Sequence, residues 1–144
     1  MQKDIWFDMD GTIADLYGVS GWLGMLRNED ATPYRKAKPL VSMSTLARLL
    51  HKAQKHGYTI NIISWCSKHA TAEYDTAVAQ AKCEWLRKHL PSVDWDKIEI
   101  VAYGTPKGAG RMGILFDDEL NNRQNWHNGV AYDEKVIFDI LRAL

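Results

Sequence analysis

The sequence contains few cysteines and no long apolar segment. Its two cysteines, Cys66 and Cys83, are too few for a disulfide framework and lack the spacing of a zinc site. No apolar run approaches the roughly 18 residues of a membrane span, and residues 1–11 lack the continuous apolar core of a signal peptide. We therefore expect a cytoplasmic protein with reduced thiols and no membrane partner.

The sequence also lacks an excess of charge of either sign. Eighteen Lys and Arg residues balance eighteen Asp and Glu residues, so the formal net charge at pH 7 is zero. Proteins that bind duplex nucleic acid usually present a strongly basic face to the phosphates. We therefore expect no duplex nucleic-acid partner.

The length of 144 residues is close to the prior of about 150 residues for one domain. Hydrophobic residues make up 46% and charged residues 25%, which is average for a globular protein with a packed core. We expect residues 1–144 to form a single domain.

Short apolar runs alternate with segments of helical periodicity, a pattern typical of a parallel α/β sheet. We predict a Rossmann-like fold with three layers, helix on sheet on helix. The expected strands cover residues 5–7, 58–63, 98–102 and 114–116, with a short edge strand at 129–132. The expected helices run from Ser44 to a stop at Gly57, from about Ala70 to Leu90, and from a cap at Asp133 to the end of the chain.

Residues 15–43 follow neither period and contain several glycines and prolines, which is typical of a long loop or a mini-cap. The basic and aromatic side chains of this segment would suit a nucleotide through charge and base stacking. They are Arg27, Arg35, Lys36, Lys38, Trp22 and Tyr34.

Two of the predicted strands end in acids. Asp8 and Asp10 follow the first strand, and Asp117 and Asp118 follow the strand at 114–116. Ligand sites of open parallel sheets lie beyond the carboxyl ends of the strands, so these four acids should meet and repel one another there. Mg²⁺ relieves such repulsion through one or two carboxylates, waters and a substrate phosphate. The sequence therefore predicts a Mg²⁺ site that handles phosphate.

Residues 8–12, Asp-Met-Asp-Gly-Thr, match the D-x-D-G-T signature that opens the haloacid dehalogenase-like (HAD) phosphatase superfamily. Three further landmarks of that superfamily follow in the same order. Ser64 resembles the hydroxyl residue at the end of the second strand, Lys107 the lysine of the third motif, and residues 116–118, Phe-Asp-Asp, the acidic fourth motif. The chain therefore resembles this superfamily over nearly its whole length.

The resemblance implies catalysis through an aspartyl-phosphate. Asp8 would be the nucleophile, and Asp10 would protonate the leaving alkoxide and later activate water. Ser64 would hydrogen-bond a phosphoryl oxygen, while Lys107 would offset the negative charge of the phosphoryl group and the nucleophile.

The resemblance also implies a set of metal ligands. Asp8, the backbone carbonyl of Asp10, and Asp117 would hold Mg²⁺. Asp118 would assist through water or through hydrogen bonds to the ligands, and the assignment between Asp117 and Asp118 stays open.

A finer resemblance concerns the substrate. Residues 64–68, Ser-Trp-Cys-Ser-Lys, and residues 82–91, which begin with Lys82 and include Trp85, are similar to the 5'(3')-deoxyribonucleotidase branch, where a lysine closes the second motif and a K-x-x-W helix follows. That branch has a larger helical cap than residues 15–43 can form, so a reduced cap is implied. The implied substrate contacts are Gly11, Thr12, Ser64, Trp65, Lys68 and Lys107.

The expected function is Mg²⁺-dependent hydrolysis of a phosphomonoester, with a (deoxy)nucleoside monophosphate as the favoured substrate, as in a 5'-nucleotidase. One alternative is a phosphatase that acts on a nucleic-acid terminus or on a protein. Another is a binding module that keeps the HAD fold without turnover. The presence of Asp8 together with Asp10, Ser64 and Lys107 favours an enzyme.

Overall fold

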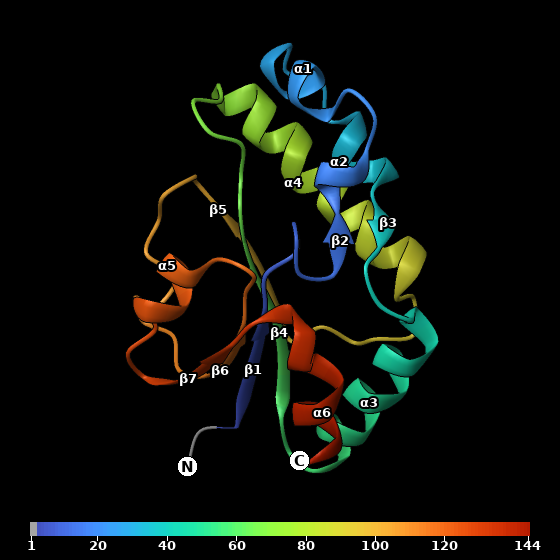
Figure 1. The fold of residues 1–144 in the computed structure, drawn as a ribbon, viewed down its shortest axis with the longest axis vertical. Helices are drawn as coiled ribbons and strands as arrows, with labels where there is room; N and C mark the ends of the chain where they lie inside the picture. Colours follow the sequence, from blue (N-terminus) through green and yellow to red (C-terminus); the bar gives the residue numbers. More distant parts are fainter. Residues whose placement is uncertain (1–2) are drawn as a thin grey trace.

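The computed structural model describes residues 3–144. Five strands form one parallel sheet in the spatial order β5-β4-β1-β6-β7 (Figure 1). Their bounds are β1 Asp4–Phe7, β4 Thr59–Trp65, β5 Lys97–Val101, β6 Gly113–Phe116 and β7 Gly129–Tyr132. All five predicted strands are thus confirmed. β4 extends beyond the predicted end, which places Ser64 within the strand.

Within residues 3–144, six α-helices and two 3-10 turns accompany the sheet. Their bounds are η1 Leu16–Gly18, α1 Trp22–Arg27, α2 Thr32–Lys36, α3 Met43–Lys55, α4 Ala72–His89, α5 Leu120–Gln124, η2 Glu134–Val136 and α6 Ile137–Arg142. The three predicted helices correspond to α3, α4 and α6. Within residues 3–144, no helix combines the length and the apolar character needed to cross a membrane.

The helix ends differ from the predicted ones by local hydrogen bonding. α3 begins earlier than predicted because the hydroxyl of Ser42, not of Ser44, accepts the Thr45 N–H at 3.3 Å. At its other end the chain turns at Gly57, where φ is 90°, as predicted for a helix stop. Asp133 caps the last helical segment as predicted, but that segment opens with the 3-10 turn η2.

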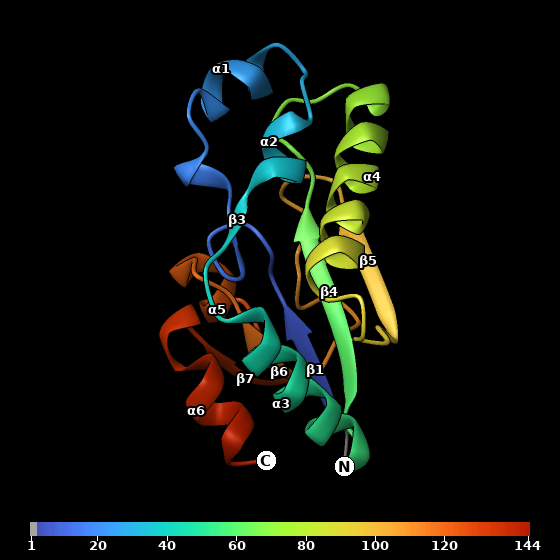
Figure 2. The same ribbon diagram turned by 90° about the vertical axis from the view of Figure 1, so that its right-hand side faces the viewer.

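Helices α3, α4 and α6 all pack on one face of the sheet (Figure 2). Side chains alternate between the two faces of a strand, and Ile5, Phe7, Ile60 and Ile62 point to this helical face. They form the main core together with Leu46, Leu49 and Leu50 of α3, Trp85 and Leu86 of α4, and Ile137 and Leu141 of α6. This core holds β1 and β4 rigidly below the ends where the acids lie.

The opposite face of the sheet has a thinner cover. Trp6, Ile63 and Leu115 form a small buried cluster with Trp126, which follows the five-residue helix α5. The rest of the cover is the loop 102–112 between β5 and β6, and the Trp6 indole donates to the carbonyl of Met112 at 3.1 Å. The predicted second helical layer is therefore reduced to α5 and a loop, because the glycine-rich segment before β6 forms no helix.

Residues 14–39 form an ordered unit above the carboxyl ends of the strands (Figures 1 and 2). It consists of η1, α1, α2 and a two-stranded antiparallel ribbon, β2 Ala14–Asp15 with β3 Lys38–Pro39. The unit packs on α4 through a second hydrophobic cluster, formed by Leu16, Ala31, Tyr34, Tyr74, Val78 and Ala81. Because this cluster includes residues of α4, the segment is anchored to the helix that follows β4.

Candidate active site

Three carboxylates gather at the carboxyl ends of β1 and β6. Asp8 directly follows β1, and Asp117 and Asp118 follow β6, the neighbour of β1 in the sheet. One oxygen of each carboxylate lies within 4.8 Å of the others. The parallel pairing of the two strands therefore brings together the acids whose convergence the strand-end rule predicts.

Lys107 provides a positive charge inside this cluster. Its ammonium donates to Asp8 Oδ1 at 2.9 Å and to Asp117 Oδ2 at 2.8 Å, and it lies 5.1 Å from the centre of the Trp65 ring. Burial alone would lower the pKa of Lys107, but the carboxylates of Asp8 and Asp117 raise it above its usual value. The charged form of Lys107 is therefore favoured, and its single positive charge is shared between two of the three carboxylates.

Arg111 fixes the loop that carries Lys107. One guanidinium nitrogen donates to the carbonyls of Lys107 and Ala109, at 3.1 and 3.3 Å. The Nε atom donates to Glu99 of β5 at 3.0 Å, and the guanidinium lies 5.6 Å from the centre of the Trp6 ring. A single side chain thus connects the loop to β5 and β1, in a position where no helix supports Lys107.

Asp10 lies beside the cluster and is held by a second buried lysine. The Lys82 ammonium, on α4, donates to Asp10 Oδ2 at 2.9 Å, to Ser64 Oγ at 2.6 Å and to the carbonyl of Trp65 at 2.7 Å. An ammonium has three N–H donors, so each of them has an acceptor. Lys82 therefore connects α4 to the loop after β1 and to the end of β4.

Sequence analysis assigned Lys82 no role in the site. It falls one turn after Val78 on the buried stripe of α4, and only 1% of its surface is exposed. A lysine at a buried position of an amphipathic helix needs an anionic or polar partner, because an unpaired buried charge is strongly unfavourable. That position in the stripe, together with its place at the start of the K-x-x-W segment, is the signal that could have identified it.

Gly11 and Thr12 lie behind the carboxylates, and neither lines the cavity described below. The fully buried Thr12 hydroxyl lies 2.9 Å from Asp8 Oδ2 and 3.2 Å from Asp118 Oδ1, and it accepts the Asp118 N–H at 3.1 Å. At Gly11, φ is 80° and the backbone packs directly against the Asp118 carboxylate, which leaves no room for a side chain. Both residues therefore help to position the acids, and their contact with substrate stays a prediction.

Burial shifts three acids of the site, Asp10, Asp117 and Asp118, toward their protonated forms. It is the main cause that raises the pKa of Asp10, where the charge of Asp8 adds to the effect and Lys82 opposes it. Burial and then the charge of Asp8 raise the pKa of Asp117 to about 6 and that of Asp118 to about 8. Such a group of desolvated, mutually repelling carboxylates is the electrostatic environment that a bound cation relieves.

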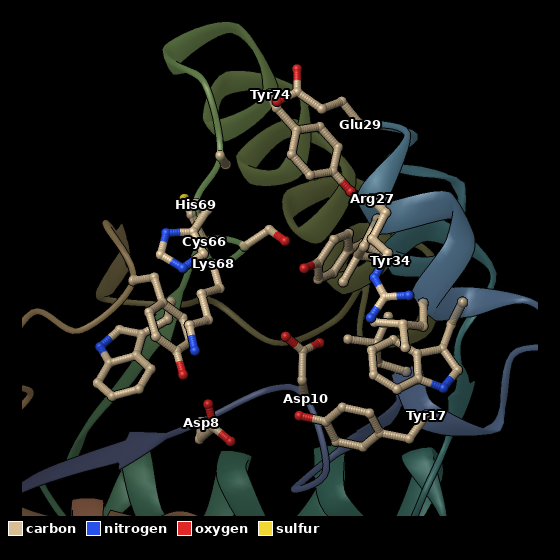
Figure 3. Close-up of a pocket in the computed structure, with 18 of the residues that line it drawn as sticks. Asp8, Asp10, Tyr17, Arg27, Glu29, Tyr34, Cys66, Lys68, His69 and Tyr74 are labelled. Carbon is tan, nitrogen blue, oxygen red and sulfur yellow. The ribbon is translucent and has the colours of Figure 1, made fainter.

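A cavity of about 610 Å³ opens above Asp8 and Asp10 (Figure 3). Its walls come from the 14–39 unit on one side and from the loop between β4 and α4 on the other. Aromatic side chains contribute much of this lining. They are Tyr17, Trp22, Tyr34, Trp65, Tyr74 and Tyr103.

The predicted site residues divide into two groups by their relation to the cavity. Asp8, Asp10, Trp65, Lys68 and Lys107 line it. Ser64, Gly11, Thr12, Asp117 and Asp118 do not line it. Thr12 and Asp117 contact the lining residues Asp8 and Lys107 through hydrogen bonds. Ser64 accepts from Lys82, and Gly11 packs against Asp118.

Of the basic side chains in the 14–39 unit, Arg27 lines the cavity, whereas Lys36 and Lys38 do not. Arg35 instead pairs with Glu84 on the outside of α4, with 2.7 Å between nitrogen and oxygen. Trp22 and Tyr34 do line the cavity, and Tyr17 joins Trp22 in an edge-to-face pair whose ring centres lie 5.0 Å apart. The Tyr17 hydroxyl points toward Asp10 (Figure 3).

Comparison of the chain with protein-family models and with curated proteins found no match to either.

Proposed function

We propose that this protein is a Mg²⁺-dependent phosphomonoesterase of the HAD type that works through an aspartyl-phosphate. The observation that carries the proposal is the setting of Asp8. Its carboxylate lies at the base of the cavity and contacts the Lys107 ammonium and the Thr12 hydroxyl, and Asp10 follows it by two residues on the same wall. This arrangement supplies a fixed oxygen nucleophile and a separate proton-transfer group.

The residues present fit a Mg²⁺ ion. Asp8, Asp117 and Asp118 offer hard oxygen ligands, and the raised pKa values of Asp117 and Asp118 support a group whose negative charge Lys107 offsets only in part. When bound, the ion would lower the energy of the charge on the transferred phosphoryl group. We propose Asp8 and Asp117 as direct ligands with the Asp10 carbonyl, and Asp118 as the residue that orients them.

In the proposed first step, an Asp8 oxygen attacks phosphorus while the bond from phosphorus to the leaving oxygen breaks. Asp10 donates its proton to that oxygen, so the product leaves as a neutral alcohol. Burial favours this step, because it raises the pKa of Asp10 and makes the carboxylic acid easier to populate near neutral pH.

In the second step, Asp10 accepts a proton from a water molecule while the water oxygen attacks the phosphorus of the aspartyl-phosphate. The bond from phosphorus to the Asp8 oxygen breaks, and inorganic phosphate and the Asp8 carboxylate are restored. Asp10 is then protonated for the next cycle. Lys107 stabilises Asp8 as a leaving carboxylate in this step, because its ammonium lies 2.9 Å from Asp8 Oδ1.

For the substrate, we propose a phosphorylated molecule with a planar group, with a (deoxy)nucleoside monophosphate as the leading candidate. The aromatic walls of the cavity support this choice, because Tyr17 with Trp22 and Trp65 with Tyr103 form two pairs on which a ring can stack. In this proposal the 14–39 unit acts as a reduced cap. Cys66 and Cys83 are free thiols, which fits the proposed cytoplasmic location.

The test is phosphate release from deoxy- and ribonucleoside monophosphates, sugar phosphates and a phosphorylated oligonucleotide, with and without Mg²⁺. Asp8→Asn is the control, because it preserves the shape of the side chain and removes the nucleophilic carboxylate. We expect metal-dependent release that this variant loses by at least about a thousandfold. Equal release by wild type and Asp8→Asn would contradict the mechanism.

A non-catalytic binding module predicts a different result. Such a protein would bind Mg²⁺ and beryllium fluoride, a phosphoryl mimic, without releasing phosphate from any substrate. Calorimetric titration with both separates this alternative from a failure of the whole proposal, because a protein that binds neither has no phosphoryl site.

A further inference from the structure

The mouth of the cavity carries two cations in addition to the paired lysines of the site. Arg27 ends α1, and Lys68 lies in the loop between β4 and α4; Figure 3 shows their side chains on the two sides of the cavity, above Asp8 and Asp10. Within residues 3–144, neither forms a salt bridge. Both are therefore available to an anion that enters the cavity.

The backbone is strained at the same place. In the described part of the chain, two residues other than glycine have positive φ, Glu29 at 56° and His69 at 55°, and both line this cavity. Glu29 follows Arg27 by two residues, and His69 directly follows Lys68. Strained residues of this kind persist where the surrounding structure enforces them, and they are frequent at ligand sites.

The acid nearest to Arg27 in sequence is already engaged. The Glu29 carboxylate accepts the Thr71 N–H at 3.2 Å and the Thr71 hydroxyl at 2.9 Å, which ties the 14–39 unit to the start of α4. Glu119, another acid of the lining, follows β6 and contacts the Asn122 amide at 3.4 Å. The two acids deepest in the cavity, Asp8 and Asp10, are paired with Lys107 and Lys82. Among residues 3–144, none of these acids therefore forms a salt bridge with Arg27.

We infer that the substrate carries a second phosphate-type anion beside its phosphomonoester, and that Arg27 and Lys68 bind this second anion at the mouth of the cavity. The inference rests on the proposed function. A guanidinium recognises phosphate with two parallel N–H donors, and an ammonium adds a point charge. A small bisphosphorylated molecule offers this chemistry, and so does an oligonucleotide with a terminal phosphate, whose neighbouring phosphodiester is the second anion.

The experiment compares three matched substrates: thymidine 5'-monophosphate, thymidine 3',5'-bisphosphate, and a thymidine dinucleotide with a 5'-terminal phosphate. For wild-type protein with Mg²⁺ we would measure kcat/KM for release of the 5'-phosphate. For Asp8→Asn, which retains substrate without turnover, we would measure Kd. We expect the second anion to improve both values by about tenfold or more.

Arg27→Gln should bring the ratio between doubly and singly anionic substrates close to one. Arg35→Gln is the matched control, because Arg35 lies on the same 14–39 unit but pairs with Glu84 outside the cavity, and this variant should keep the ratio. A gain for the bisphosphate alone identifies a small molecule, and an equal gain for the dinucleotide identifies a polymer end.

A ratio near one in the wild type, or a ratio that Arg27→Gln leaves unchanged, overturns the inference. The proposed function is judged separately, by phosphate release from the monophosphate. Release with no benefit from a second anion leaves the phosphatase standing without this subsite. A tighter Kd for the bisphosphate that depends on Arg27, with no release from any substrate, supports the subsite and rejects the catalytic proposal.

Discussion

The Lys82 ammonium lies 2.9 Å from the Asp10 carboxylate and 2.6 Å from the Ser64 hydroxyl, so one side chain of α4 contacts both the loop after β1 and the end of β4. Lys82 also lies 5.1 Å from the centre of the Tyr34 ring, which belongs to the 14–39 unit. The helix therefore links the proposed acid-base group to the walls of the cavity.

Replacing Lys82 by methionine should impair the proposed acid-base step. Asp10 would lose both a charge that lowers its pKa and the donor that orients it. We expect kcat to fall by about tenfold to a hundredfold, with the pH dependence of kcat shifted to higher pH. Steady-state kinetics between pH 5 and 9 measure both effects.

The double variant Lys82→Met with Asp10→Asn tests whether the two residues act as a pair. Since the single variant leaves a buried acid without its partner, the second substitution should restore part of the lost stability. Additive losses in the free energy of unfolding would show that the two side chains are not coupled.

Mg²⁺ should stabilise the protein more as the pH rises. The folded-state pKa values of Asp117, about 6, and Asp118, about 8, lie above the ordinary value for Asp, so without metal these groups lower the stability increasingly as the pH rises from about 4 to 8. We expect the metal-free Tm to fall over this range. Mg²⁺ at a fixed concentration of a hundred times its Kd at pH 8 should add about 2.7 kcal/mol at pH 8 and much less at pH 5, where its Kd is higher.

Asp118→Asn is the control for this pH effect. It removes one of the repelling charges, so the metal-free variant should be more stable than wild type at pH 8 and similar to it at pH 5. Scanning calorimetry with chelator or with Mg²⁺ measures each condition. A Mg²⁺ effect that is the same at both pH values would show that these carboxylates do not form the metal site.

The strand pattern and the acids at the strand ends could be predicted from the sequence because they depend on simple rules. Apolar runs predict buried parallel strands, and parallel strands bring their carboxyl ends to one edge. The same rules do not predict the contacts that helix side chains make across the core. Lys82 therefore escaped the prediction, although its partners Asp10 and Ser64 were both expected in the site.

The helices of the 14–39 unit could not be predicted from its sequence, because they are too short to form on their own. α1 has six residues and α2 has five, well below the length at which an isolated helix is stable in water. Their order depends on contacts with α4, such as the hydrogen bond from the Tyr74 hydroxyl to the carbonyl of Asp30 at 2.9 Å. Contacts between distant segments leave no periodic signal.

Gly11→Ala should destabilise the protein and weaken Mg²⁺ binding together. The backbone at Gly11 has a φ of 80°, and an added Cβ would overlap the Asp118 carboxylate. We expect a loss of about 1–3 kcal/mol in the free energy of unfolding. Gly24→Ala is the matched control, since nothing lies within 4 Å of a Cβ added there, in α1, and alanine favours a helix. Equal unfolding midpoints in urea for the two variants would contradict the role assigned to Gly11.

Arg111→Gln should reduce catalysis without removing any group that lines the cavity. The guanidinium donates to the carbonyl of Lys107 and to Glu99, so its loss frees the loop that places the Lys107 ammonium between Asp8 and Asp117. We expect kcat to fall by about tenfold to a hundredfold, and hydrogen exchange to quicken in residues 103–112.

Arg111→Lys keeps the charge but not the forked donors and should recover a small part of the rate. Arg142→Gln controls for the loss of an arginine, because Arg142 ends α6 and does not line the cavity. Unchanged exchange in the loop with a lower kcat would show that Arg111 acts on the reaction by another route than holding Lys107.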